Sequence, residues 1–298
     1  MSAAAVLART ATEVRQEKAE EDIVQRRSRI LVVVAHPDEA EEYASGTIAG
    51  LADRGHHVKV LCATNGDAGH ATMRRKPLAK RRLREAYAAA DILGIAEYEV
   101  WDVHDGDLVA SVELRKRMIR AIRSWRADVV ITFADEGGGH PDNRAAAQLA
   151  RAAAGLVTLP NQVPDVPPLE VAPVVVRMID FGSIDQHRVD VVVDTTPHIA
   201  RKLAACAAHA SQFLEFAPHE RGLSDLVPTD ASDVDAFILE YWSEFLYTQP
   251  PARERLHEAG HPDPDAVVYA ETFELAPYGR AASADAVQAL FDGRALTV

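Results

Sequence analysis

The stretch RILVVVAHPDE (residues 29–39) places a polar cluster directly after a run of apolar residues. Its apolar part, RILVVVA, has the length and composition of a strand that is buried on both faces. His36, Asp38 and Glu39 follow, and ionisable side chains of this kind are not expected within a buried strand. The cluster therefore either caps the next helix or supplies metal ligands and a base, and the rest of the chain has to decide between the two.

Strands and helices alternate through the following 180 residues or so. The expected strands are 29–35, 56–64, 98–103, 127–134, 174–179 and 188–194, and the expected helices are 45–55, 78–94, 112–126, 141–155 and 196–213. This alternation predicts an α/β fold with a mostly parallel, Rossmann-like sheet and helices on both faces. Because such sheets bind ligands at the carboxyl ends of their strands, the segments after Ala35, Thr64, Val103 and Ala134 should share one site.

The chain is expected to divide into three parts. Residues 1–27 resemble an amphipathic leader helix, and residues 28–215 form the α/β catalytic domain. Residues 216–298 are a C-terminal extension packed on the same domain, with a helical stretch at 233–247 and a strand-like stretch at 266–275. No internal repeat or low-complexity linker separates these parts, so we expect one domain with a C-terminal elaboration.

The composition limits the partners. The 298 residues are 48% hydrophobic and carry a formal net charge of −13, which disfavours nucleic acid and anionic membranes as partners. The basic run at 74–82 reads as the exposed face of a helix. Cys62 and Cys206 have neither disulfide-framework nor zinc-finger spacing, and we see no signal peptide and no membrane-spanning run. We expect a cytoplasmic protein that acts on a small molecule, and self-association into a homo-oligomer stays open.

Two of the four strand ends carry the same triplet. His36-Pro37-Asp38 follows the first strand and His140-Pro141-Asp142 follows the fourth. A histidine nitrogen with neighbouring carboxylates can bind a metal ion and also move a proton. The dinucleotide fingerprint GxGxxG and the nucleophile elbow GxSxG are absent, which disfavours a nicotinamide enzyme and a serine hydrolase.

Several ordered motifs resemble one known family. They are AHPDEAE (35–41), RRLREAY (81–87), DGDL (105–108), HPDNRAA (140–146) and HASQF (209–213). In this order they resemble the LmbE-like (PIG-L) family of zinc-dependent N-deacetylases and amidases, whose motifs are A-H-P-D-D, D-G-x-L, H-P-D-H-R-A and H-x-S-Q. The resemblance covers residues 29 to 213 and implies hydrolysis of an N-acyl bond on an amino sugar or a related natural product.

The resemblance also implies roles for individual residues. His36, Glu39 and Asn143 stand at the three metal-ligand positions, and Asp38 stands at the position of the general base. His140 would stabilise the oxyanion or protonate the leaving amine, with Asp142 orienting it. Arg82 and Asp105 would contact the substrate. Asp67 is expected to bind substrate as well, because it lies in the turn after the second strand, TNGDAGH (64–70).

Two metal-ligand positions depart from the family pattern. Glu39 replaces Asp, which moves the carboxylate outward by about 1.5 Å, one C–C bond. Asn143 replaces His, and an amide oxygen suits harder cations better than zinc. The expected cofactor is therefore a divalent metal, zinc if the family pattern holds, with no metal as the alternative.

Three classes of function follow from these residues. The first is a metal-assisted amide hydrolase with Asp38 as general base. The second is a metal-independent enzyme that uses His36, Asp38, His140 and Asp142 for acid–base chemistry in an elimination, isomerisation or cyclisation. The third, a catalytically silent binding protein, is disfavoured because such a protein needs no ionisable residues at its strand ends.

Overall fold

A computed structural model describes residues 23–24 and 26–294 of the chain. Nearly all of the expected leader helix, residues 1–27, lies outside the described residues. The strands are β1 (Arg29–Val34), β2 (His57–Cys62), β3 (Glu97–Val100), β4 (Val129–Thr132), β5 (Val174–Met178), β6 (Val191–Asp194) and β7 (Ala270–Gly279). The helices are α2 (Glu39–Asp53), α3 (Arg75–Leu93), α4 (Val112–Trp125), α5 (Pro141–Ala154), α6 (Ile199–Ala208), α7 (Ala217–Glu220), α8 (Val234–Tyr241), α9 (Pro250–Glu258) and α10 (Ala284–Asp292).

The strands form one sheet in the order β3-β2-β1-β4-β5-β7-β6. The first five strands of this order are parallel, and β7 runs antiparallel to both β5 and β6. The predicted α/β class with a mostly parallel sheet is confirmed. No helix in the described part of the chain is long and apolar enough to cross a membrane.

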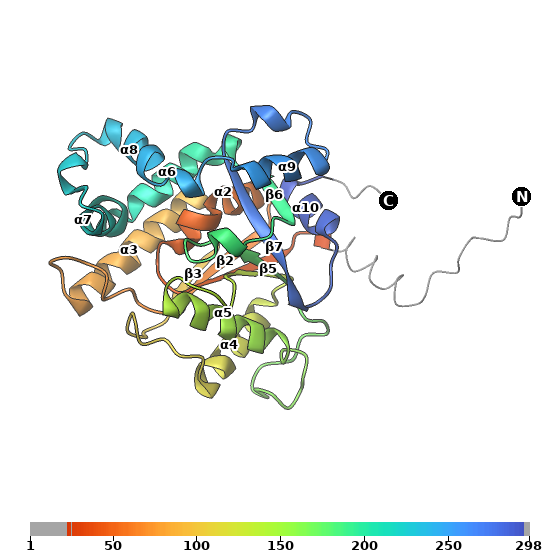
Figure 1. Ribbon diagram of the computed structural model, residues 1–298. Coiled ribbons are helices and arrows are strands. Elements are labelled where there is room, and N and C mark those ends of the chain that lie inside the picture. The colour runs from red at the N-terminus through yellow and green to blue at the C-terminus, as the bar shows by residue number, and fades with distance from the viewer. Residues whose placement is uncertain (1–22, 25, 295–298) are drawn as a thin grey trace, which may run out of the picture.

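Each face of the sheet is covered by its own set of helices. Alternate residues of β1 point to opposite faces, so that Val32 packs in one core and Leu31 and Val33 pack in the other. Helices α2, α3, α6 and α10 cover the first face, and α4 and α5 cover the second (Figure 1). Burial on both faces explains why the strands read as continuous apolar runs.

The strand order reverses direction at β1. The chain proceeds from β1 outward to β2 and β3, and then returns to place β4 on the other side of β1. An open α/β sheet has its ligand crevice at such a switch point, outside the carboxyl ends of the two strands. In this chain those ends carry the two His-Pro-Asp triplets.

The second half of the chain contains helices that were not expected, α7, α9 and α10, and two expected elements differ in their bounds as follows. The expected helix 196–213 is interrupted at His209, after which residues Ser211–Phe216 form a π-helix. The expected strand at 266–275 is shifted to Ala270–Gly279 and lies between β5 and β6. The chain beyond residue 216 thus contributes a strand to the interior of the sheet.

Candidate active site

The first strand end is held by Glu39, the first residue of α2. Its Oε2 accepts hydrogen bonds from the backbone N–H groups of Ala35 and His36, both at 2.8 Å. Its Oε1 lies 3.0 Å from Nδ1 of His36. The glutamate side chain therefore folds back over the end of β1 and fixes the imidazole that follows it.

His36 lies at the centre of a group of carboxylates. Its Nε2 is 3.1 Å from Oδ1 of Asp105 and 3.5 Å from Oδ2 of Asp142. Burial alone would lower the pKa of His36, but the negative charge of Glu39 and the hydrogen bonds with Asp105 and Asp142 raise it well above its usual value. The surroundings of this imidazole thus favour a positive charge.

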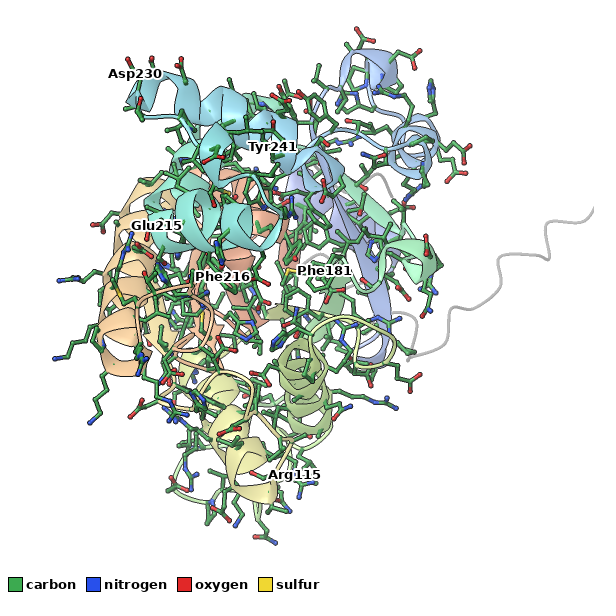
Figure 2. All side chains as sticks on the ribbon, turned by 60° about the vertical axis from the view of Figure 1, so that its left-hand side comes forward. Arg115, Phe181, Glu215, Phe216, Asp230 and Tyr241 are labelled. Atoms are coloured by element: carbon green, nitrogen blue, oxygen red, sulfur yellow. The ribbon has the colours of Figure 1, made fainter. Side chains whose placement is uncertain are left out.

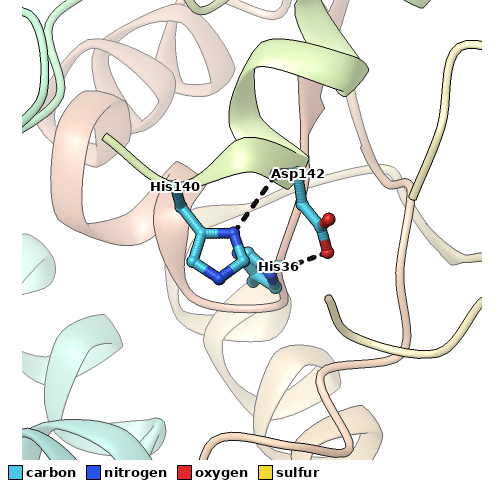
Figure 3. A group of neighbouring side chains, drawn as sticks. All are labelled: His36, His140 and Asp142. Atoms are coloured by element: carbon cyan, nitrogen blue, oxygen red, sulfur yellow. Dashed lines mark hydrogen bonds and ion pairs between the residues drawn. The ribbon is translucent and has the colours of Figure 1, made fainter. Parts of the chain in front are cut away.

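The second triplet begins α5. The backbone N–H of Asp142 donates to Nδ1 of His140 at 3.3 Å, so His140 caps the helix, and Pro141 occupies its first turn. The rings of His36 and His140 meet edge to face with centroids 4.6 Å apart. Within the described part of the chain, a ligand atom from each of His36, His140 and Asp142 forms a group that spans no more than 4.8 Å and could hold a metal ion (Figure 3).

The Asp142 carboxylate connects three strand ends. It faces His36, and its two oxygens accept hydrogen bonds from the backbone N–H groups of Gly106 (2.7 Å) and Leu108 (3.3 Å). Burial raises the pKa of Asp142, but the bonds from His36 and Gly106 outweigh it and hold the pKa below its usual value. The contact between Asp142 and His140 runs through the backbone N–H, whereas the carboxylate orients His36.

Arg82 pairs with Asp38 at the mouth of the first strand end. Arg82 Nη2 is 2.9 Å from Asp38 Oδ1, and Nη1 donates to the carbonyl of Gly66 at 3.0 Å. Gly66 has a φ of +64°, and a Cβ at this position would lie 2.7 Å from the guanidinium. Burial raises the pKa of Asp38, and the charge of Arg82 opposes that shift. A glycine turn therefore makes room for the cation that holds the expected base.

The other expected substrate-binding residues are Asp105, in the loop after β3, and Asp67, in the loop after β2. Asp105 contacts His36, and its Oδ2 is 3.9 Å from Nη1 of Arg82. Asp67 accepts a hydrogen bond from the backbone N–H of Asp105 at 3.2 Å and pairs with His104. Asp67 thus supports the loop that presents Asp105.

Asn143 is fully buried behind the second triplet. Its Nδ2 donates to Oδ2 of Asp180 at 3.3 Å. Its Oδ1 is buried without a hydrogen-bond partner among the described residues. A buried carbonyl oxygen in this state is costly unless it meets a water molecule or a cation.

The strand ends open into a cavity of about 410 Å³. His36, Asp38, Glu39, Arg82, Asp105 and His140 line it together with Glu42, Tyr43, Ala68, Gly69, Phe181, Gln212 and Phe216. Seven of these lining residues were not predicted as site residues: Glu42, Tyr43, Ala68, Gly69, Phe181, Gln212 and Phe216. Glu42 lies in the first turn of α2, four residues after the N-cap residue Asp38, so the two side chains lie on the same side of the helix. This spacing was a signal in the sequence from which Glu42 could have been predicted. Burial and the charges of Asp38 and Glu39 raise the pKa of Glu42 to about 8.

Comparisons with known proteins show which sequences and folds this chain resembles. The family model for GlcNAc-PI de-N-acetylase (PIG-L) matches residues 31–154. The diacetylchitobiose deacetylase of Thermococcus kodakarensis is 31% identical over 192 residues, which cover 63% of this chain and 71% of that protein. The 1D-myo-inositol 2-acetamido-2-deoxy-alpha-D-glucopyranoside deacetylase of Nakamurella multipartita is 30% identical over 244 residues, covering 65% of this chain and 82% of that protein.

Solved structures share the fold at lower identity. The N,N'-diacetylchitobiose deacetylase of Pyrococcus horikoshii has a TM-score of 0.63 and 24% identity, and the match covers 90% of this chain and 94% of that one. GalB, the 4-carboxy-2-hydroxymuconate hydratase of Pseudomonas putida, has a TM-score of 0.66 and 20% identity over 87% of this chain and 99% of that one. The switch point between β1 and β4, the two His-Pro-Asp strand ends and the extent of the curated matches lead to one assignment: this chain belongs to the PIG-L (LmbE-like) family.

Proposed function

We propose that this protein hydrolyses an N-acyl bond on an amino-sugar-like or natural-product small molecule, with a divalent metal and with Asp38 as the general base. The relatives named above are deacetylases of acetylated amino sugars. The observation that carries the proposal is the Asp38 carboxylate, which is held by Arg82 and opens into the same cavity as His36 and His140.

We assign the metal to the three family positions, His36, Glu39 and Asn143, and not to the group of His36, His140 and Asp142, because both carboxylate oxygens of Asp142 already accept backbone hydrogen bonds. His36 Nδ1 and Glu39 Oε1 are 3.0 Å apart, a separation that two ligand atoms bound at about 2.0–2.1 Å to one ion can have. The unpartnered Oδ1 of Asn143 would be the third ligand atom. One nitrogen and two oxygens form a harder set than the family pattern provides. When bound, such an ion polarises an acyl oxygen and lowers the pKa of a water molecule.

The residues of the chain would perform the proton transfers. Asp38 accepts a proton from the attacking water, and the ion pair with Arg82 keeps its carboxylate in one orientation. His140 faces the negative charge that develops on the acyl oxygen, or protonates the departing amine. Asp142 and Asp105 hold the ring of His36 between them.

A second candidate is metal-independent acid–base chemistry in an elimination, isomerisation or cyclisation. The observation in its favour is the enclosure of His36 by Glu39, Asp105 and Asp142, because a protonated imidazole there would supply the positive charge without a metal ion. We rank it second because it leaves the buried Oδ1 of Asn143 unexplained.

The test is a product assay on purified protein. N-acetylglucosamine and its methyl glycoside are incubated with the enzyme, and released acetate and free amine are measured together. Equal amounts of both products support amide hydrolysis, whereas consumption of a substrate without acetate release supports the second candidate. We also propose a cytoplasmic location, which the two free, buried cysteines support.

A further inference from the structure

A smaller cavity of about 180 Å³, here called the side arm, adjoins the active-site cavity. The arm is lined by Asp38, Glu42, Tyr43, Phe181, Gln212, Phe213, Ala217, Arg221 and Trp242. The first five of these are also lining residues of the main cavity. A molecule whose amide lies beside Asp38 can therefore extend into the arm without leaving the site.

Phe181 lines both cavities. Its ring is exposed to solvent, although residues next to it in the chain are buried. Phe181 is 57% exposed, although Asp180 next to it is fully buried and Ser183 is 5% exposed. The backbone N–H of Asp180 donates to Ser183 Oγ, and the backbone N–H of Ser183 donates to the Asp180 carbonyl, both at 3.0 Å. Asp180 also pairs with Arg144 of α5. The anchored turn therefore holds the Phe181 ring at the edge of both cavities, where a bound molecule can contact it.

The same turn is packed against the loop that carries His140. A Cβ added to Gly182 would overlap the backbone of Gly139, so the two glycines let the loops touch. This contact fixes the position of Phe181 relative to His140. The glycine run at 137–139, which we expected to let the backbone approach a ligand, here admits the backbone of a neighbouring loop.

The opposite wall comes from the π-helix and the segment after it. Phe216 lies over Gly69, where an added Cβ would be 3.2 Å from its ring. Phe213 and Trp242 pack with ring centroids 5.1 Å apart. In Figure 2, Phe216 and Phe181 approach the opening from different elements, Phe216 from the helical segment and Phe181 from the loop after β5.

Most polar groups of the arm are already in use. Gln212 Nε2 donates to the carbonyl of Gly69, Arg221 Nη1 donates to the carbonyl of Tyr241, and Asp38 pairs with Arg82. The backbone N–H of Glu42 donates to the Asp38 carbonyl, but the Glu42 carboxylate has no hydrogen bond or ion pair with any residue that the structure describes. A ring with many hydroxyl groups would leave most of them unpaired here. A flat apolar ring packs on the aromatic side chains of the arm and leaves only the Glu42 carboxylate, which a polar substituent on the ring or a water molecule can meet.

We propose that the arm is a subsite for a flat apolar ring carried by the substrate next to the scissile amide, and that Phe181 is its specificity-determining residue. This inference rests on the proposed function, because it takes the reacting amide to lie beside Asp38. The ring is part of either a group attached to the sugar or the acyl group. The experiment below uses one substrate for each of these two cases.

The test compares kcat/KM for three substrates: methyl N-acetylglucosaminide, 4-nitrophenyl N-acetylglucosaminide, and methyl glucosaminide with an N-benzoyl group. The native enzyme should prefer one of the two ring-bearing compounds over the first, and that compound identifies the source of the ring. Phe181→Ala should reduce the preference roughly two- to tenfold, the range for the loss of one aromatic contact. Phe181→Tyr keeps the ring and should retain the preference. Ile184→Ala, in the same loop but lining a separate apolar cavity, is the matched control.

Calorimetric binding of the same compounds to Asp38→Asn separates this inference from the proposed function. Turnover of all three compounds at equal kcat/KM overturns the subsite and leaves the hydrolase in place. Absence of turnover with a ring preference in binding that Phe181→Ala removes overturns the hydrolase and leaves the subsite in place. An unchanged preference in Phe181→Ala overturns the assignment of Phe181.

Discussion

Arg82 and Asp38 form an ion pair of 2.9 Å that is almost closed to solvent, with side-chain exposures of 3% and 14%. The pair joins the middle of α3 to the end of β1. Arg82 belongs to the basic run at 74–82, most of which lies on the outer side of the helix as expected. Its inward position shows that one member of a charge run can serve the site while its neighbours are solvated.

Asp38→Asn should reduce turnover by roughly 10²–10⁴-fold, because an amide cannot accept the proton and loss of a general base usually costs that much. Circular dichroism and the melting temperature should show an intact fold. Asp107→Asn, an exposed acid near the same strand ends, is the control and should retain full activity. More than about a tenth of native activity in Asp38→Asn would remove Asp38 from the mechanism.

His140→Ala should lower kcat much more than it raises KM. The reason is that His140 is expected to face charge that appears only in the transition state. Steady-state kinetics of the variant give both constants, with His257→Ala at an exposed position as the control. A change confined to KM would make His140 a substrate-binding residue instead.

Gly182→Ala should destabilise the protein by about 1–3 kcal/mol, the usual cost of overpacking, because the new methyl group meets the Gly139 backbone. Urea unfolding measures the free energy. Gly155→Ala is the control, since Gly155 has a negative φ and ordinary space around it. Equal stability of the two variants would show that the loops do not touch as described.

The stability of the fold should depend on pH through His187. Burial lowers the pKa of His187 to about 4, with a smaller opposing effect from Glu274. The unfolded chain takes up this proton near pH 6.5 and the folded chain does not, so the free energy of unfolding falls as pH decreases from 6.5 to 4. The loss is at most about 3 kcal/mol, because each pKa unit corresponds to about 1.4 kcal/mol and the ring is partly solvated.

His187→Gln should flatten this part of the stability curve, measured by urea unfolding at several pH values. His257→Gln, at an exposed position, should leave the slope unchanged. An identical slope in His187→Gln and the native protein would assign the acid sensitivity to other groups.

The sequence was informative where structure is local. The apolar run before His36 predicted β1, and the two triplets predicted which strand ends meet, because parallel strands place their carboxyl ends together. Both predictions depend only on residues close in the chain and on a general rule of sheet topology. Likewise, Asp105 and Arg82 were expected at the site and line its cavity.

Features that depend on distant contacts could not be read in this way. The position of β7 between β5 and β6 depends on pairings across about 80–100 residues, for which a single strand pattern carries no signal. The sequence carries no signal for the exposed position of Phe181, because that position depends on the burial of Asp180 and on the contact between Gly182 and Gly139. The apolar pattern of residues 196–213 continues through His209 and therefore predicted one unbroken helix. Helix α6 nevertheless ends before His209, so tertiary packing and not the local pattern sets its end.

The two altered ligand positions, Glu39 and Asn143, should change which metal ion the protein holds. With Glu39 and Asn143 in place, the native protein should hold zinc weakly or prefer a harder divalent ion. The double variant Glu39→Asp with Asn143→His restores the family pattern and should retain zinc through dialysis. Equal zinc retention by both proteins would show that the two departures do not alter the site.

The most direct test of the central claim is elemental analysis of protein purified without chelator, combined with the amide hydrolysis assay before and after chelator treatment. We predict that the protein contains about one divalent metal ion per chain, that chelator treatment abolishes hydrolysis, and that hydrolysis recovers when the metal is returned. Protein that contains no metal and converts substrate at the full rate in chelator would contradict it, and the cluster around His36 would then perform metal-free acid–base catalysis.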